Sequence, residues 1–221
     1  MVKTSEDSGS VSQRKEERIF QYVVLGLAIF VGIGFFLAAM ALSGHEESRG
    51  IAPDRPRFLT DFSLTDSLGR TVTKAQLDGK TLVVSFLFTS CATTCPEVSR
   101  RMAEIQLLTT NLPDVQLISI TVDPRSDTPS TLAKWGEHYG ADTNRWLMLT
   151  GSKPMLYQLI GNSFLTTNDS ALYDYMPGHF VGTERIAIVD RRGSVRVYYD
   201  GLRPETARAV VAELNRLRNE H

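Results

Sequence analysis

The stretch from Leu82 to Met102 constrains the fold more than any other part of the chain. Its apolar run, Leu82 to Phe88, predicts a buried strand, and a short polar loop follows. Pro96 then stands where a helix takes its first position. The two cysteines of the protein, Cys91 and Cys95, therefore both fall in one strand-to-helix turn. Because the start of a helix stabilises anions, a thiol there loses its proton more easily, and a thiolate is both a nucleophile and a soft metal ligand.

Length and charge limit the other classes of function. The chain has 221 residues, which is room for one ordinary domain and a smaller segment. Its formal net charge is −1 and it contains no block rich in lysine and arginine, which argues against nucleic-acid binding. The segment from Ile19 to Gly44 has no charged residue and is long enough to cross a bilayer as a helix.

A cleaved signal peptide, cut near Ala39-Met40-Ala41, is the alternative interpretation of this segment. The apolar core exceeds the roughly 7–15 residues of a signal peptide, and the polar stretch before it is long, which favours an uncleaved anchor. Only Arg49 follows the segment closely, whereas four basic residues precede it: Lys3, Arg14, Lys15 and Arg18. We therefore expect one span of the cytoplasmic (inner) membrane, with the amino terminus on the cytoplasmic side and the folded domain on the periplasmic, extracytoplasmic side.

The sequence divides into four parts. Residues 1–18 are polar, with nothing to bury, and are expected to form a disordered cytoplasmic tail. Residues 19–44 are the expected transmembrane helix, and residues 45–57, with charges and two prolines but no periodicity, the expected tether. Residues 58–221 remain for one folded domain, and no feature indicates an oligomer.

Strand and helix patterns alternate through the domain, which predicts an α/β fold. The predicted strands are 58–64, 70–72, 82–88, 115–122, 146–149, 185–189 and 195–199, and the predicted helices are 97–112, 127–139, 153–160 and 204–218. The two buried strands around the first helix imply a parallel unit, and the order of elements is that of a thioredoxin-like fold: a central mixed sheet flanked by helices, with an amino-terminal hairpin.

Two thiols outside the cytoplasm either exchange disulfides or bind a soft metal. The structural alternatives are a pair of buried small apolar side chains and a stabilising disulfide. The position of both cysteines beside a strand and a helix-starting proline, with no other cysteine in the chain, favours a functional pair. The Cys-x-x-x-Cys spacing is one residue longer than the Cys-x-x-Cys of most redox thioredoxins.

The segment Cys91-Ala-Thr-Thr-Cys95-Pro96 resembles the Cys-x-x-x-Cys-Pro signature of the SCO/SenC family (synthesis of cytochrome c oxidase), whose members are thioredoxin-like copper-binding proteins. The resemblance continues in Ile118 to Pro129 and Trp146 to Gly151, and it covers residues 57 to 218. A membrane anchor before the domain is also typical of the family. The resemblance implies a thioredoxin-like fold preceded by one transmembrane helix.

His179 is the candidate third ligand. In a thioredoxin-like fold the loop before the strand 185–189 lies beside the cysteine turn, and here that loop lacks the proline of thioredoxin-like oxidoreductases. Two thiolates and an imidazole suit Cu(I), while thiolates also suit Zn(II); the resemblance implies copper, as Cu(I) or Cu(II), held by Cys91, Cys95 and His179. The family usually has this histidine a few residues closer to the strand, with a small polar residue after it, whereas this chain has Phe180 after the histidine and an apparent insertion before the strand. A solvated loop histidine is the alternative.

Three further side chains are secondary candidates. Asp123 and Asp127 are explained structurally as the end of a strand and the cap of a helix. Functionally, the resemblance places Asp123 near the metal end of the sheet, where a carboxylate would orient a ligand or a partner. Met176, near His179, is a soft potential donor, although most methionines fill space.

The resemblance implies a membrane-anchored copper chaperone that delivers copper to the dinuclear centre of cytochrome c oxidase subunit II, or to another copper protein, without a catalytic cycle. The alternative is an extracytoplasmic thiol–disulfide oxidoreductase that keeps the oxidase cysteines reduced, with Cys91 and Cys95 as the redox pair. A peroxidase of the peroxiredoxin type is disfavoured because that chemistry expects Thr-x-x-Cys, and Phe88 and Ala92 occupy the threonine positions.

Overall fold

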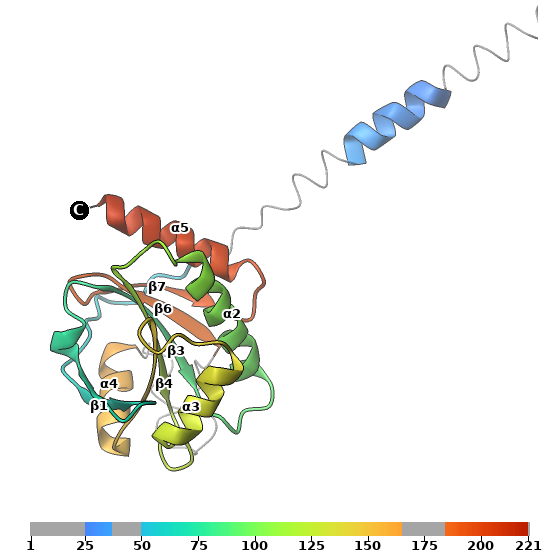
Figure 1. The fold of residues 1–221 in the computed structure, drawn as a ribbon. Helices are drawn as coiled ribbons and strands as arrows, with labels where there is room; N and C mark the ends of the chain where they lie inside the picture. The colour runs from blue at the N-terminus through green and yellow to red at the C-terminus, as the bar shows by residue number, and fades with distance from the viewer. Residues whose placement is uncertain (1–24, 37–49, 165–183, 221) are drawn as a thin grey trace, which may run out of the picture. The chain divides into compact units, whose positions relative to one another are not determined.

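The computed structural model describes residues 25–36, 50–164 and 184–220, which belong to two compact units, Met1–Glu46 and Glu47–His221 (Figure 1). In the first unit, residues 25–36 are helical and their side chains are exposed. Among the described residues, none of the helices combines the length and the apolar character that a bilayer crossing requires. The remainder of the expected span, residues 19–24 and 37–44, lies outside the described residues, as does the expected tail at residues 1–18.

The second unit alternates strands and helices as the sequence predicts. Its elements are β1 (Ser63–Asp66), β2 (Thr71–Thr73), the short 3-10 helix η1 (Lys74–Gln76), β3 (Thr81–Leu87), α2 (Thr94–Leu108), β4 (Val115–Thr121), α3 (Pro129–His138), β5 (Trp146–Thr150), α4 (Lys153–Ser163), β6 (Arg185–Val189), β7 (Val195–Asp200) and α5 (Thr206–Asn219). The predicted α/β architecture, with a central mixed sheet and an amino-terminal hairpin, is confirmed.

The strands form one seven-stranded sheet in the order β2-β1-β5-β4-β3-β6-β7. The three central strands β3, β4 and β5 are parallel, whereas β1, β2, β6 and β7 pair antiparallel. The carboxyl ends of the three parallel strands therefore meet at one end of the sheet. The amino-terminal end of β6 lies there too, because Ser85 near the end of β3 pairs with Ile186.

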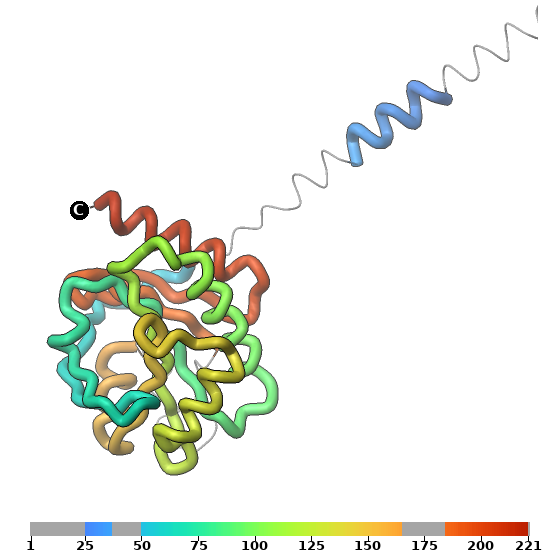
Figure 2. The backbone as a smooth tube through the Cα atoms, viewed as in Figure 1, coloured from blue at the N-terminus to red at the C-terminus, as the bar shows by residue number. Residues whose placement is uncertain are grey.

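Helices cover both faces of the sheet, which is why β3 and β4 are buried along their whole length and mainly apolar rather than alternating between apolar and polar residues. Leu156 and Ile160 of α4 pack on one face, against Val84 and other side chains of that core. On the opposite face, the core includes apolar side chains of α2, α3 and α5. There α2 and α5 lie side by side, as the backbone trace shows (Figure 2).

The helix after the cysteines begins earlier than predicted. It starts at Thr94, so Pro96 is the third helical residue instead of the first. A proline is tolerated there because the first N–H groups of a helix have no partner within the helix. The shift places Cys95 inside the first turn of α2. The helix ends at Leu108, before the predicted Leu112, where the Thr109 hydroxyl donates to the carbonyl of Ile105 at 2.7 Å.

Residues 51–57, expected as part of the tether, instead pair with the domain. The amide of Ile51 donates to the Tyr198 carbonyl at 2.8 Å, and the Tyr198 amide donates back at 2.8 Å. The carbonyl of Arg57 accepts a hydrogen bond from the amide of Val195 at 2.9 Å. These bonds cover the free edge of β7, where unpaired backbone groups would otherwise be exposed. The absence of periodicity in this stretch does not reveal such pairing, because the bonds use backbone atoms.

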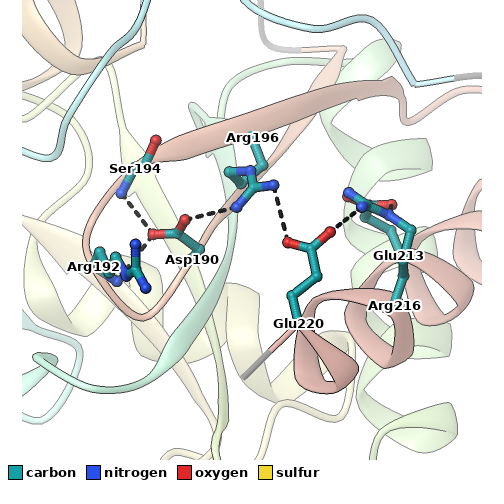
Figure 3. A network of polar contacts seen from close by, with 7 residues as sticks. All are labelled: Asp190, Arg192, Ser194, Arg196, Glu213, Arg216 and Glu220. Carbon is teal, nitrogen blue, oxygen red and sulfur yellow. Dashed lines mark hydrogen bonds and ion pairs between the residues drawn. The ribbon is translucent and has the colours of Figure 1, made fainter.

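A polar network joins the β6–β7 turn to the end of α5, at the end of the sheet away from the cysteines (Figure 3). Asp190, 5% exposed, accepts bonds from the amides of Arg192 and Ser194, both at 2.9 Å. Arg196 donates to Asp190 at 3.1 Å and to Glu220 at 3.1 Å. The buried carboxylate thus closes the turn, whereas the outer pair fastens the tip of the helix.

Asp190→Ala is expected to destabilise the fold much more than Glu220→Ala. The first change leaves two turn amides and a guanidinium without their acceptor, at a cost of about 2–3 kcal/mol. The second removes exposed ion pairs worth about 0–1 kcal/mol. Urea denaturation of the two variants measures the difference. Equal losses would show that the turn does not depend on this carboxylate.

Candidate metal centre

The cysteine turn lies at the end of the sheet where the parallel strands finish. The amide of Val122, just after β4, donates to the carbonyl of Leu87 at 2.9 Å and so extends the sheet to the point where the turn begins. The amide of Cys91 then donates to the carbonyl of Phe88 at 3.1 Å, which closes a four-residue turn. The last strand residue, the turn and the first turn of α2 therefore fix where both sulfurs lie.

Both cysteines are free thiols, and their surroundings differ. Cys91 is 9% exposed and Cys95 is fully buried. The sulfur of Cys91 accepts a hydrogen bond from the amide of Cys95 at 3.3 Å and lies 3.4 Å from the hydroxyl oxygen of Thr94. The first turn of α2 therefore directs an N–H group at the Cys91 sulfur, as a helix start does for an anion.

These contacts separate the pKa values of the two thiols. Burial alone would raise the pKa of Cys91, but hydrogen bonds from the Thr94 side chain and from the Cys95 amide and thiol outweigh it and lower the pKa to about 7. Burial raises the pKa of Cys95 to about 12, and the neighbouring Cys91 adds to this rise, only partly offset by a hydrogen bond from the Phe88 backbone. As pH rises above about 7, Cys91 therefore becomes mainly a thiolate while Cys95 keeps its proton.

This arrangement is chemically suited to a soft cation. Cys91 offers a thiolate next to solvent, while Cys95 offers a second sulfur that becomes a ligand when its proton leaves. A metal ion that binds both sulfurs therefore releases a proton. Thiolate ligands favour soft or borderline ions such as Cu(I) and Zn(II).

His179 and Met176 lie outside the described residues, so their positions relative to the sulfurs are not described. Within the described part of the chain, no group of three or more potential metal-binding His, Cys, Asp or Glu side chains is present. Glu184, just before β6, lies close to Val98 of α2. Both are near Gly201, where an added Cβ would be 2.9 Å from the Glu184 carbonyl oxygen and 3.0 Å from a methyl group of Val98. The segment that carries His179 therefore ends near the helix that carries Cys95.

Asp123 stands at the end of a strand as predicted, whereas Asp127 does not have its predicted structural role. Asp123 follows β4, and its amide donates to the Thr121 hydroxyl at 3.0 Å; it lines a surface pocket that also includes Arg125 and Lys153. Asp127 does not cap α3. The capping residue is Thr128, whose hydroxyl accepts from the Thr131 amide at 3.2 Å, and the Asp127 carboxylate is buried behind the cysteine turn. The sequence pattern of aspartate before threonine and proline fits a cap at either residue, which explains the error.

The fold and the two buried thiols at its central strand-to-helix turn define a thioredoxin-like dithiol protein. A family model described as SCO1/SenC matches residues 52–219, and the chain belongs to this family.

Known relatives agree with this assignment. The "SCO1 protein homolog" of Bacillus subtilis is 35% identical over 92 residues, which cover 41% of this chain and 47% of the relative. The matched part is therefore less than two thirds of that relative's length. A SCO1/SenC family lipoprotein of Bacillus anthracis has 26% identity and a TM-score of 0.64, covering 76% of this chain and 99% of that one. ScoI of Bradyrhizobium japonicum, solved with copper bound, has 25% identity and a TM-score of 0.56, covering 72% and 99%.

Proposed function

We propose that this protein is a copper chaperone in which Cys91, Cys95 and His179 hold the ion. It delivers copper to the dinuclear centre of cytochrome c oxidase subunit II or to another copper protein. The observation that carries the proposal is the pair of free thiols at the start of α2, one of them with a pKa lowered to about 7. The solved relative from Bradyrhizobium japonicum, which has copper bound, supports the choice of metal.

The unequal burial of the two thiols fits the delivery of an ion. Cys91 lies at the surface side of the turn and Cys95 lies within it, so an incoming partner ligand meets the ion next to Cys91 first. A site of two sulfurs and one imidazole has few ligands, which lets a partner thiolate add before a sulfur of this chain leaves. The proton that Cys95 loses on loading is taken up again on release, because its pKa in the empty site is raised to about 12.

Thiol–disulfide exchange is the second candidate, and the lowered pKa of Cys91 is the observation that favours it. In this reaction the Cys91 thiolate attacks a partner disulfide, forms a mixed disulfide and expels one partner thiolate. Cys95 then displaces the second partner thiolate, so the partner is reduced and Cys91–Cys95 is oxidised. The buried, protonated state of Cys95 slows this resolving step, which makes the exchange role the weaker of the two.

Anaerobic titration of the chain with Cu(I), beside an insulin-reduction assay, tests the proposal. The expected result is tight binding of one copper ion per chain, with insulin reduction far below that of a thioredoxin. Rapid insulin reduction without copper binding would instead establish the oxidoreductase. A chain that neither binds Cu(I) nor reduces insulin would contradict both functions.

We also propose that residues 19–44 anchor the domain in the cytoplasmic membrane, with residues 1–18 inside and the copper site outside. The support is the uncharged span in the sequence and the basic residues that precede it.

Alkaline phosphatase fused after His221 is expected to be active, because this enzyme needs the oxidising exterior to form its disulfides. The matched control is a fusion after Arg18, which should be inactive. An inactive full-length fusion of normal abundance would reverse the orientation, and a mature chain that lacks residues 1–41 would contradict the anchor.

A further inference from the structure

The carboxylate of Asp127 is completely buried and joins two segments that are distant in sequence. It accepts a hydrogen bond at 2.5 Å from the hydroxyl of Thr121, at the end of β4. It also accepts a hydrogen bond from the Thr89 hydroxyl at 2.5 Å. The Thr89 amide donates to both carboxylate oxygens, at 3.2 Å each. Three donor groups from two segments thus converge on one buried carboxyl group, which makes it a firm point of attachment.

Thr89 is the residue through which this attachment reaches the cysteines. It is the second residue of the turn that the bond from the Cys91 amide to the Phe88 carbonyl closes. Both polar groups of Thr89 that can donate are directed at Asp127. The side chain of Asp127, 38 residues from Thr89 in the sequence, therefore sets the position of the turn. It also sets the direction from which Cys91 approaches the start of α2.

The Cys91 sulfur depends on that direction. Its two contacts, with the Cys95 amide at 3.3 Å and the Thr94 hydroxyl at 3.4 Å, both come from the start of α2. A small displacement of the turn would lengthen both. Ser90 and Ala92, on either side of Cys91, are exposed, so neither of these side chains is packed in the interior to hold the turn.

We propose that Asp127 is a positioning residue for the metal centre: through Thr89 it holds the cysteine turn so that the Cys91 sulfur stays aligned with the first turn of α2. Asp127 touches neither sulfur and acts only through the turn. The consequence for copper rests on the proposed function, whereas the consequence for the thiols does not.

The test compares Thr89→Val with the matched control Thr89→Ser in the full-length chain. Valine has the shape of threonine without the hydroxyl, so it removes the bond at 2.5 Å and keeps the amide; serine keeps both bonds. The first readout is the rate of iodoacetamide alkylation of Cys91 relative to Cys95 in the copper-free chain at pH 7. We expect the ratio to fall about tenfold in Thr89→Val, as expected from the loss of one buried hydrogen bond, and to stay within twofold of the wild type in Thr89→Ser.

The second readout is copper, added as Cu(I) with a competing chelator and as Cu(II) with recording of the absorption spectrum. Thr89→Val should lose Cu(I) to the chelator about tenfold more readily and show a changed Cu(II) spectrum, while Thr89→Ser matches the wild type in both. Asp127→Asn, which keeps the shape of the side chain, should fall between the two.

The outcomes separate this inference from the proposed function. If Thr89→Val is less stable to urea but keeps the wild-type alkylation ratio, Asp127 supports only the fold and the inference is wrong. If the wild-type chain binds no copper while Thr89→Val still loses its thiol selectivity, the proposed function fails and the positioning role stands. If Asp127→Asn does not fold, the two Thr89 variants decide the question.

Discussion

Replacing both cysteines, as Cys91→Ser with Cys95→Ser, is expected to abolish tight copper binding in a chain that still folds. Serine is close to cysteine in shape, and neither sulfur is part of a disulfide, so no crosslink is lost. In the buried position 95 the new hydroxyl would have the Phe88 backbone as its partner, as the sulfur does. Alcohol oxygens are poor ligands for a soft ion, so the remaining imidazole cannot retain Cu(I).

Competition with a Cu(I) chelator measures the loss, and circular dichroism checks the fold. Thr93→Ser, an exposed change within the same turn, is the matched control and should bind copper as the wild type does. Each single cysteine variant should already lose tight binding. A folded double variant that still binds one copper ion tightly would show that the metal site lies elsewhere.

In the copper-free chain, Cys91 is expected to be alkylated at least a hundredfold faster than Cys95 at pH 7. The pKa values of about 7 and about 12 give Cys91 about 10⁵ times more thiolate. A thiolate of lower pKa is intrinsically less nucleophilic, which reduces the ratio to about 10²–10³, and the burial of Cys95 raises it again. The rate at Cys91 should be half-maximal near pH 7 and level off about one pH unit higher, because its pKa is lowered to about 7 and its thiolate forms as pH increases through that value.

Mass spectrometry of the peptides after short exposure to iodoacetamide gives both rates. In urea the two thiols should react at similar rates, since the unfolded chain has neither the hydrogen bonds nor the burial. Equal rates in the folded chain, or a Cys91 rate that keeps rising to pH 9, would contradict the geometry of the turn.

The central part of the fold could be read from the sequence because its signals are local. Every residue of β3 and β4 is buried, and apolar residues therefore predominate on both faces of these strands. The short hairpin of β6 and β7 is marked by Arg191-Arg192-Gly193, where Gly193 adopts a positive φ of 78°. The cysteine turn could be placed for the same reason, since strand, loop and proline follow one another directly.

Features that depend on distant contacts could not be read in this way. The pairing of residues 51–57 with β7 uses backbone groups and leaves no side-chain pattern. The burial of Asp127 depends on Thr89 and Thr121, which are separated from it by 38 and 6 residues. A buried carboxylate needs hydrogen-bond donors, and the two threonines near the ends of neighbouring strands are the only sequence sign of such donors that we identify. Threonine is too common in strands for this sign to predict the burial of Asp127.

His179 illustrates the remaining gap between sequence and site. The strand that follows it, β6, is correctly predicted and begins at the cysteine end of the sheet, beside β3. The histidine itself lies outside the described residues, so its role as a ligand stays a prediction. The apparent insertion between His179 and β6 lengthens the connection, and the strand therefore does not fix the position of the imidazole.

X-ray absorption at the copper edge, on the chain loaded with one equivalent of Cu(I), tests the central claim most directly because it identifies the atoms bound to the metal. We expect two sulfur ligands and one nitrogen ligand, with the nitrogen lost in His179→Ala and both sulfurs kept. The His179→Ala variant should also lose Cu(II) while weakening Cu(I) less, since thiolates dominate the binding of the softer ion. A first shell of nitrogen and oxygen without sulfur, or a spectrum unchanged in His179→Ala, would contradict the site of two cysteines and one histidine.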